Sequence, residues 1–223
     1  CYIGKRRLED AIKQIDHPIE VTYRCFELDP TADRDIKENI YEKLAKKYGM
    51  SIDQAKANTE NMVNMAKEVG LDYQMDTLIL TNTFDAHRLT MYAKTKGLMK
   101  EMTDRILHAY YTESKHIGDH DTLTELAVEV GLDREAVQKI LASDEMADAV
   151  RADEQAAQQI GVSGVPFYLI NQKYALTGAQ PTEVFVQALK KVIAEAEEKI
   201  TVLNSGNEDG VVCDDNGCEI PKK

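Results

Sequence analysis

Residues 31–160 contain one amphipathic helical segment after another and almost no strand signal. The pattern differs on both sides of this stretch. Residues 2–15 have apolar side chains at helical spacing, and residues 19–28 (IEVTYRCFEL) are rich in strand formers. Near the other end, residues 165–170 and 173–178 predict a β-hairpin, and an amphipathic helix follows it. This order predicts an α/β fold whose sheet is interrupted by a long helical insertion.

A recurring phrase marks the ends of helices within the insertion. It reads AKKYGMS at 45–51, AKEVGLD at 66–72 and AVEVGLD at 127–133. Gly49, Gly70 and Gly131 suit the left-handed position that ends a helix. Ser51 and Gln54 have the spacing of a capping box, which predicts that a new helix begins there.

The charge balance excludes two classes of partner. The 223 residues carry 27 Lys and Arg against 39 Asp and Glu, a formal charge of −12. Such a surface repels phosphate backbones and anionic lipids, so we expect neither nucleic acid nor a membrane as partner. No run of apolar residues is long enough to predict a membrane span.

The chain opens on Cys1, and its first helix leads directly into the predicted strand at 19–28. A helix followed by a strand is half of a βαβ unit, so we expect another strand before Cys1. We expect residues 1–30 and 161–198 to form one domain, residues 31–160 a helical insertion domain, and residues 199–223 a flexible tail.

Three segments carry a resemblance to a known family: CYIGKRRLE at 1–9, NTFDAHRL at 82–89 and GVSGVPFYLI at 161–170. Over residues 1–198 the chain resembles the DsbA-like thioredoxin-fold oxidoreductases, specifically the cytoplasmic FrnE group. The resemblance implies a thioredoxin-like fold with a large all-helical insertion. It also implies thiol–disulfide oxidoreductase or isomerase activity on protein substrates in the cytoplasm, with no cofactor or metal. Glutathione as a further partner and a homodimer are left open.

In that family a strand ends in Cys-Pro-aromatic-Cys, and Tyr-Ile/Leu-Gly follows. The resemblance therefore makes Cys1 the second, resolving cysteine of the motif, at a helix start that favours thiolates. Lys5 and Arg6, one turn later, either add positive potential or are ordinary solvated charges. Val165-Pro166 corresponds to the family's cis-proline loop, which faces the redox motif, and the Val165 backbone there pairs with an extended substrate.

Two other places hold candidate residues. Asn82 or Thr83 can cap the helix that begins at FDAHRL, and His87 lies one turn into it. Asn82 and His87 either contact substrate or serve as a cap and a hydrogen-bonded histidine of the fold. Cys25 lies inside the predicted strand, where we expect a buried and inert thiol.

The tail holds a second cysteine pair, Cys213 and Cys218, separated by Asp-Asp-Asn-Gly. Asn-Gly favours a tight turn, and a C-x4-C pair occurs in part of the FrnE group. A disulfide closing so small a ring adds little stability, so we expect a redox relay. Asp214 and Asp215 raise the thiol pKa values and slow attack. Half of a zinc site, or incidental cysteines, are the alternatives.

Two other functions share this architecture. One is a glutathione-dependent isomerase or transferase related to 2-hydroxychromene-2-carboxylate isomerase, which has Ser in place of the first Cys. The other is a chaperone-like protein that binds clients between the insertion and the thioredoxin-like domain. Cys1 and the tail pair favour the oxidoreductase.

Overall fold

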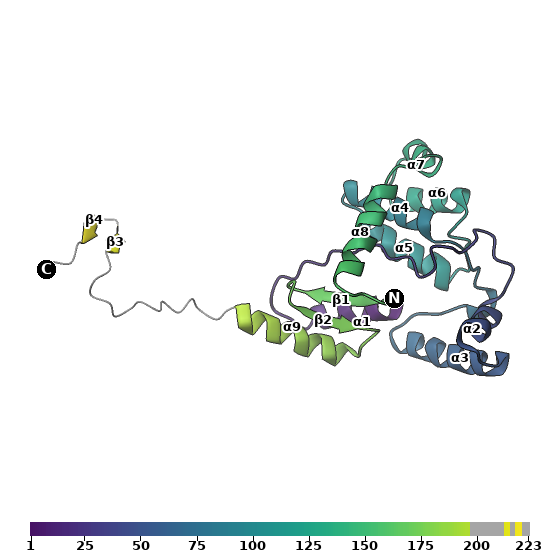
Figure 1. Cartoon of the computed structure of the whole chain (residues 1–223), viewed down its shortest axis with the longest axis horizontal. Coiled ribbons are helices and arrows are strands. Elements are labelled where there is room, and N and C mark those ends of the chain that lie inside the picture. Colours follow the sequence, from purple (N-terminus) through teal and green to yellow (C-terminus); the bar gives the residue numbers. More distant parts are fainter. Residues whose placement is uncertain (197–211, 215–216, 220–223) are drawn as a thin grey trace.

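The computed structural model describes residues 1–196, 212–214 and 217–219 (Figure 1). The α-helices are α1 (Tyr2–Ile12), α2 (Ile40–Tyr48), α3 (Ile52–Glu68), α4 (Phe84–Thr95), α5 (Met99–Tyr111), α6 (His120–Glu129), α7 (Arg134–Leu141), α8 (Ala147–Gln159) and α9 (Thr182–Ala196). A short 3-10 helix, η1, spans Met75–Thr77. The strands are β1 (Phe167–Ile170), β2 (Tyr174–Thr177), β3 (Val212–Asp214) and β4 (Gly217–Glu219). Among the described residues, no helix has the length and apolar character to cross a bilayer.

The helix ends of the insertion follow the predicted chemistry. Gly49, Gly70 and Gly131 adopt left-handed φ values of 64°, 73° and 92°. The Ser51 hydroxyl accepts the Gln54 N–H at 3.2 Å, and the Gln54 side chain accepts the Ser51 N–H at 2.9 Å. Residues 60–130, all of them described, contain no strand. The helical character predicted for this region is confirmed.

β1 and β2 form the predicted antiparallel hairpin, with Tyr168 opposite Leu176. Asn171 and Gln172 have φ values of 51° and 55°, which is the geometry of a tight type I′ hairpin turn. α1 and α9 cover one face of the hairpin. That shared core contains Ala11, Phe185 and Leu189, with Leu8, Tyr168, Ile170 and Leu176 packed against it.

The strand predicted at residues 19–28 is wrong, because the structure assigns no strand there. Within the described part of the chain, no backbone ladder includes this segment. Its amides bond to side chains of α8 instead. The Cys25 N–H donates to Asp153 Oδ2 at 2.9 Å, and the Glu27 N–H donates to Glu154 Oε1 at 3.1 Å. Strand propensity measures fit to a pleated neighbour, so it has no effect where no neighbouring strand is present.

The first turn of α1 packs against the insertion rather than against α9. Tyr2 and Ile3 are buried in a cluster with Leu71, Tyr73 and Leu78 from the segment between α3 and α4. Later turns of α1 pack on α9. Helix α1 therefore contacts both the hairpin side and the insertion.

The tail predicted to be flexible, residues 199–223, lies outside the described residues except for β3 and β4. These two strands pair antiparallel, with Cys213 opposite Cys218. The turn predicted for the Asp-Asp-Asn-Gly spacer falls on residues 215–216, which lie outside the described residues.

Candidate active site

Cys1 is exposed and occupies the N-cap of α1. Its carbonyl oxygen accepts the Lys5 N–H at 2.9 Å and so begins the helix. The first turn contains no acidic residue. The free N–H groups at a helix start carry partial positive charge, which stabilises a nearby thiolate. The position of Cys1 at the start of α1 therefore favours the thiolate form of its side chain.

The peptide bond between Val165 and Pro166 is cis, which confirms the prediction for this loop. The loop packs directly against the turn that carries Cys1. A β-carbon at Gly4 would lie 3.2 Å from Pro166 Cγ and would overlap the Tyr168 hydroxyl. The absence of a side chain at Gly4 therefore allows the cis-proline loop to approach helix α1.

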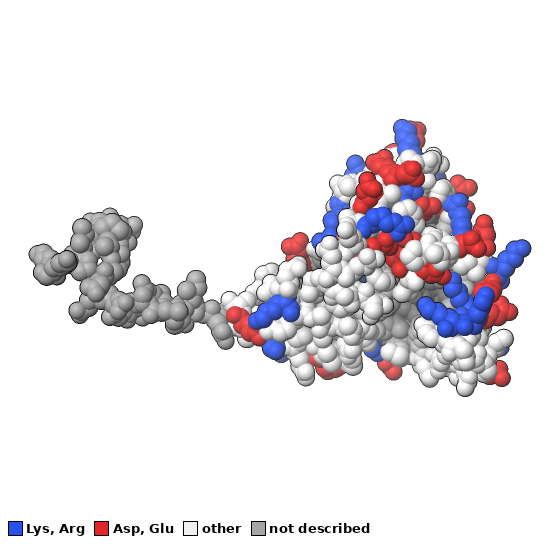
Figure 2. Space-filling view, in the orientation of Figure 1, with Lys and Arg blue, Asp and Glu red and all other residues white. Residues whose placement is uncertain are grey.

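A shallow hollow of about 270 Å³ lies at this loop. It is lined by Gly161, Ser163, Gly164, Val165, Pro166, Phe167, Thr177 and Gly178. None of these side chains ionises. Figure 2 shows the same contrast on a larger scale: charged side chains gather over the insertion, while the surface near β1 and β2 is mostly uncharged. The hollow suits backbone and apolar contacts rather than ionic ones.

The interpretation of Lys5 as an ordinary solvated charge is wrong. Its side chain is buried, and its Nζ lies 2.5 Å from Glu9 Oε1 and 2.5 Å from Asp104 Oδ1. Burial opposes the charged form, but the bonds to Asp104 and Glu9 outweigh it and hold the Lys5 pKa above its usual value. Arg6 is more exposed and contacts the ring of Tyr2.

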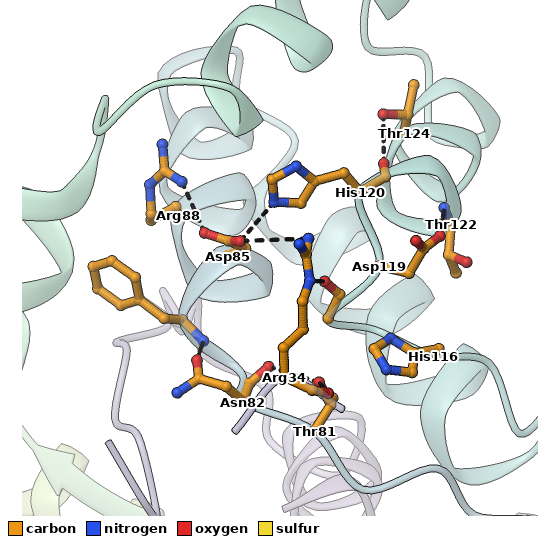
Figure 3. Close-up of polar contacts among 12 residues, drawn as sticks. Arg34, Thr81, Asn82, Asp85, Arg88, His116, Asp119, His120, Thr122 and Thr124 are labelled. Carbon is orange, nitrogen blue, oxygen red and sulfur yellow. Dashed lines mark hydrogen bonds and ion pairs between the residues drawn. The ribbon is translucent and has the colours of Figure 1, made fainter. Parts of the chain in front are cut away.

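Asn82 uses both ends of its amide within the protein (Figure 3). Its Oδ1 accepts the Phe84 N–H at 2.8 Å, and its Nδ2 donates to the Ala32 carbonyl at 3.0 Å. The side chain thus caps α4, although the N-cap position itself belongs to Thr83. One helical turn further, Asp85 bonds His120 at 2.7 Å and Arg88 at 2.8 Å. The start of α4 is therefore firmly held.

His87 is partly buried and faces the segment around Cys25. Burial lowers the His87 pKa, and the charge of Glu154 together with a hydrogen bond to the Phe26 backbone only partly offsets this effect. The imidazole is therefore neutral at neutral pH. His87 thus lies between α4 and the segment that precedes the insertion.

Cys25 is only 2 % exposed, so its predicted burial is confirmed. Burial, with a contribution from the Asp153 charge, raises the pKa of its thiol to about 12. Its Sγ donates to the His87 carbonyl at 3.8 Å. A thiol that is buried and protonated is a poor nucleophile.

We therefore expect Cys25 to resist labelling in the native protein. A bulky maleimide should modify Cys1 within minutes and leave Cys25 unmodified, as read by mass spectrometry of the tryptic peptides. In denaturant, both should react. Modification of native Cys25 at a rate near that of Cys1 would contradict its assignment as an inert thiol.

Residues 1–190 match the family model described as a DSBA-like thioredoxin domain. The chain belongs to this family. A probable DsbA oxidoreductase from Streptomyces coelicolor is 38% identical, with a TM-score of 0.85 over 100% of this chain and 94% of that one. The uncharacterized protein YwbO of Bacillus subtilis is 26% identical over 85% of this chain and 89% of its own length.

A more distant structure shares the fold. The cytosolic disulfide reductase DsbM from Pseudomonas aeruginosa, determined with GSH, is 15% identical, with a TM-score of 0.59 over 86% of this chain and 93% of that chain. Together, the family match and the solved structures confirm the thioredoxin-like DsbA fold expected from the sequence. They also support disulfide oxidoreductase activity for the family.

Two features of this DsbA-like domain escaped the sequence reasoning. Gly4 belongs to the CYIGKRRLE segment, but that motif alone does not indicate that Gly4 is the contact point for Pro166. Its signal is a glycine inside the first turn of a predicted helix, where glycine is unfavourable without a packing reason. The ion pair of Lys5 with Asp104 had no local signal, because the two residues are far apart in the sequence.

Proposed function

We propose that this DsbA-like protein is a thiol–disulfide oxidoreductase or isomerase of the FrnE group that acts on protein substrates. The observation that carries the proposal is the exposed Cys1 at the N-cap of α1, with the cis-proline loop packed against the same helical turn. In the proposal, Cys1 is the second cysteine of a C-x-x-C motif.

The reaction is an exchange of two electrons between two dithiol–disulfide pairs. In the reductive direction, the thiolate of the first cysteine attacks a substrate disulfide and forms a mixed disulfide, and one substrate sulfur leaves as a thiolate that takes up a proton. Cys1, as a thiolate, then attacks the mixed disulfide. The substrate's second sulfur leaves, and the enzyme pair is oxidised to a disulfide. The oxidative direction reverses these steps.

The hollow at the cis-proline loop supports an extended peptide as substrate. We propose that the Val165 backbone pairs with that peptide as an added strand, next to Pro166. The uncharged lining of the hollow fits contacts that are independent of substrate charge. Asn82 and His87 then act by holding the start of α4, since their polar groups already bond within the protein.

Glutathione is the small thiol partner that we propose for the same site. The support is the distant P. aeruginosa disulfide reductase, whose structure was determined with GSH and which is described as cytosolic. We extend both features, glutathione and a cytosolic location, to this chain. Residues 1–30 and 161–198 form the redox domain in this proposal, and residues 31–160 form the insertion domain.

The test of this function separates it from the two related classes. The complete protein is assayed for reduction of insulin by dithiothreitol and, in parallel, for glutathione-dependent isomerisation of 2-hydroxychromene-2-carboxylate. We expect insulin reduction well above the uncatalysed rate and no isomerisation. Isomerisation without insulin reduction would overturn the proposal, and prevention of client aggregation without either activity would favour a chaperone.

For the tail, we propose that Cys213 and Cys218 form a disulfide and exchange it with the N-terminal motif. Directly opposite residues of an antiparallel pair have Cα atoms about 4.5–5.5 Å apart, within the usual range for disulfides. A disulfide that closes only the Asp-Asp-Asn-Gly spacer removes little chain entropy from the unfolded state and so adds little stability. Such a disulfide is suited to exchange.

We expect the double variant Cys213→Ser/Cys218→Ser to fold normally but to turn over severalfold more slowly in insulin reduction. The redox state of Cys1, followed by gel shift with a maleimide, should lag behind that of the wild type. If the double variant reduces insulin at the wild-type rate and the Cys1 redox state is unchanged, the tail cysteines take no part in the exchange. Bound zinc that the double variant loses would favour the metal alternative.

A further inference from the structure

Lys5 lies where three segments of the chain meet. Its Nζ forms ion pairs with Glu9 on its own helix α1 and with Asp104 on α5, with N–O distances of 2.5 Å to both. The ring of Tyr23, from the segment that follows α1, lies 5.6 Å from the same nitrogen. Only 5 % of Lys5 is exposed. A lysine buried to this degree is unusual unless it is paired, and here it has two carboxylates.

Lys5 lies one helical turn after Cys1, and its N–H donates to the Cys1 carbonyl oxygen at 2.9 Å. Residues at i and i+4 of a helix have β-carbons about 5–6 Å apart, and Cys1 and Lys5 have this spacing. Side chains of helices lean toward the N-terminus, so Glu9 reaches back to Lys5. The charges facing the cluster are Lys5 and Arg6 against Glu9 and Asp104, with the uncharged phenols of Tyr2 and Tyr23 beside them.

The balance of these charges affects how readily the Cys1 thiol forms a thiolate. Without Lys5, the carboxylates of Glu9 and Asp104 would lose their buried counter-charge one turn from Cys1, with only the half-exposed Arg6 left, and uncompensated negative charge disfavours a thiolate. Without the Asp104 charge, Lys5 would be less compensated and would favour the thiolate more strongly. The same ion pair also ties α5 of the insertion to the first turns of α1.

We propose that Lys5 is a positioning residue for the thiol chemistry of Cys1. Its ion pair with Asp104 anchors the redox helix to the insertion, and its charge offsets the carboxylates of Glu9 and Asp104. This inference rests on the proposed function, because it requires Cys1 to be a working thiol.

The test uses two substitutions that change the charge near Cys1 in opposite directions. The rate at which iodoacetamide alkylates reduced Cys1 is measured against pH by mass spectrometry of the Cys1 peptide. We expect Lys5→Met to slow alkylation at neutral pH about threefold and Asp104→Asn to accelerate it about threefold, the effect of a half-unit change in thiol pKa. A role in folding alone would change both variants in the same direction.

Two further variants serve as controls. Lys5→Arg keeps the charge and should stay within about twofold of the wild-type rate. Asp10→Asn breaks an exposed ion pair between Asp10 and Lys13 on the same helix. Asp10 lies about 13 Å from Cys1 along the helix axis, so this variant should alkylate at the wild-type rate. Thermal unfolding followed by circular dichroism identifies variants that lose structure. If Lys5→Met does not fold, the acceleration by Asp104→Asn decides the question.

The possible failures are distinguishable. Wild-type protein that neither reduces insulin nor forms mixed disulfides through its N-terminal motif would contradict the proposed function itself. Wild-type protein that exchanges disulfides, combined with Lys5 and Asp104 variants that alkylate at the wild-type rate or shift in the same direction, would overturn only the role of Lys5.

Discussion

Replacing Cys1 by serine is expected to lower the turnover of insulin reduction at least a hundredfold. A serine hydroxyl cannot form a disulfide, so the second half of the exchange has no nucleophile. In the proposed mechanism the first cysteine still attacks, and the variant therefore accumulates mixed disulfides with substrate or glutathione. Non-reducing gels and intact-mass measurements detect these species directly.

The matched control is Cys25→Ala, which removes a thiol that is buried and bonded only within the protein. It should retain the wild-type rate within about twofold, with a modest loss of stability from the small cavity, on the order of 1 kcal/mol. A Cys1→Ser variant that keeps more than a tenth of the wild-type rate would show that its thiol is dispensable. That result would favour the glutathione-dependent isomerase class.

Gly4→Ala is the second change with a large expected effect. The added β-carbon would meet Pro166 Cγ at 3.2 Å and Ala179 Cα at 3.4 Å, and would overlap the Tyr168 hydroxyl. The Tyr168 ring cannot easily retreat, because it packs edge-on against Phe185 at 4.8 Å between ring centroids. We expect a loss of about 2 kcal/mol in the free energy of unfolding, even though alanine favours a helix.

The same change should slow disulfide exchange about tenfold, because it separates the redox helix from the cis-proline loop that the proposed substrate contacts. Chemical denaturation and insulin reduction measure the two effects. The Tyr168 hydroxyl is buried without a partner among the described residues, so Tyr168→Phe alone should be nearly neutral.

Combining the two substitutions tests the physical cause. Tyr168→Phe removes the atom that the new β-carbon overlaps, so the double variant should recover about half of the stability lost in Gly4→Ala. Strict additivity of the two changes would show that the hydroxyl is not the obstacle. A stabilised Gly4→Ala variant would show that the loop has room to yield and that Gly4 is not needed for the contact.

Several elements could be predicted because their causes are local. A helix end depends on the few residues around Gly49 or Gly70, and a capping box depends on Ser51 and its neighbour three positions later. The hairpin turn at Asn171 likewise depends on a short stretch of chain. The fold class followed from the order of such elements and from three motifs that resemble DsbA-like proteins.

The candidate site was predictable only in part. The motifs point to Cys1 and Pro166, and the cis bond expected before Pro166 is present. The contact between their two segments runs through Gly4, whose missing side chain matters only once the loop is packed on the helix. Asn82 was named as a candidate, but its hydrogen bonds to Ala32 and Phe84 appear only in the folded chain.

By itself, the sequence determined the glycine-marked helix ends, the position of the hairpin and the family, because each depends on neighbouring residues or on a contiguous motif. The tertiary structure alone decided that residues 19–28 form no strand, since a strand exists only beside another. It also decided that Lys5 is buried against Asp104. Burial and ion pairing depend on which distant segments pack together, and that information is not present in any short stretch of the chain.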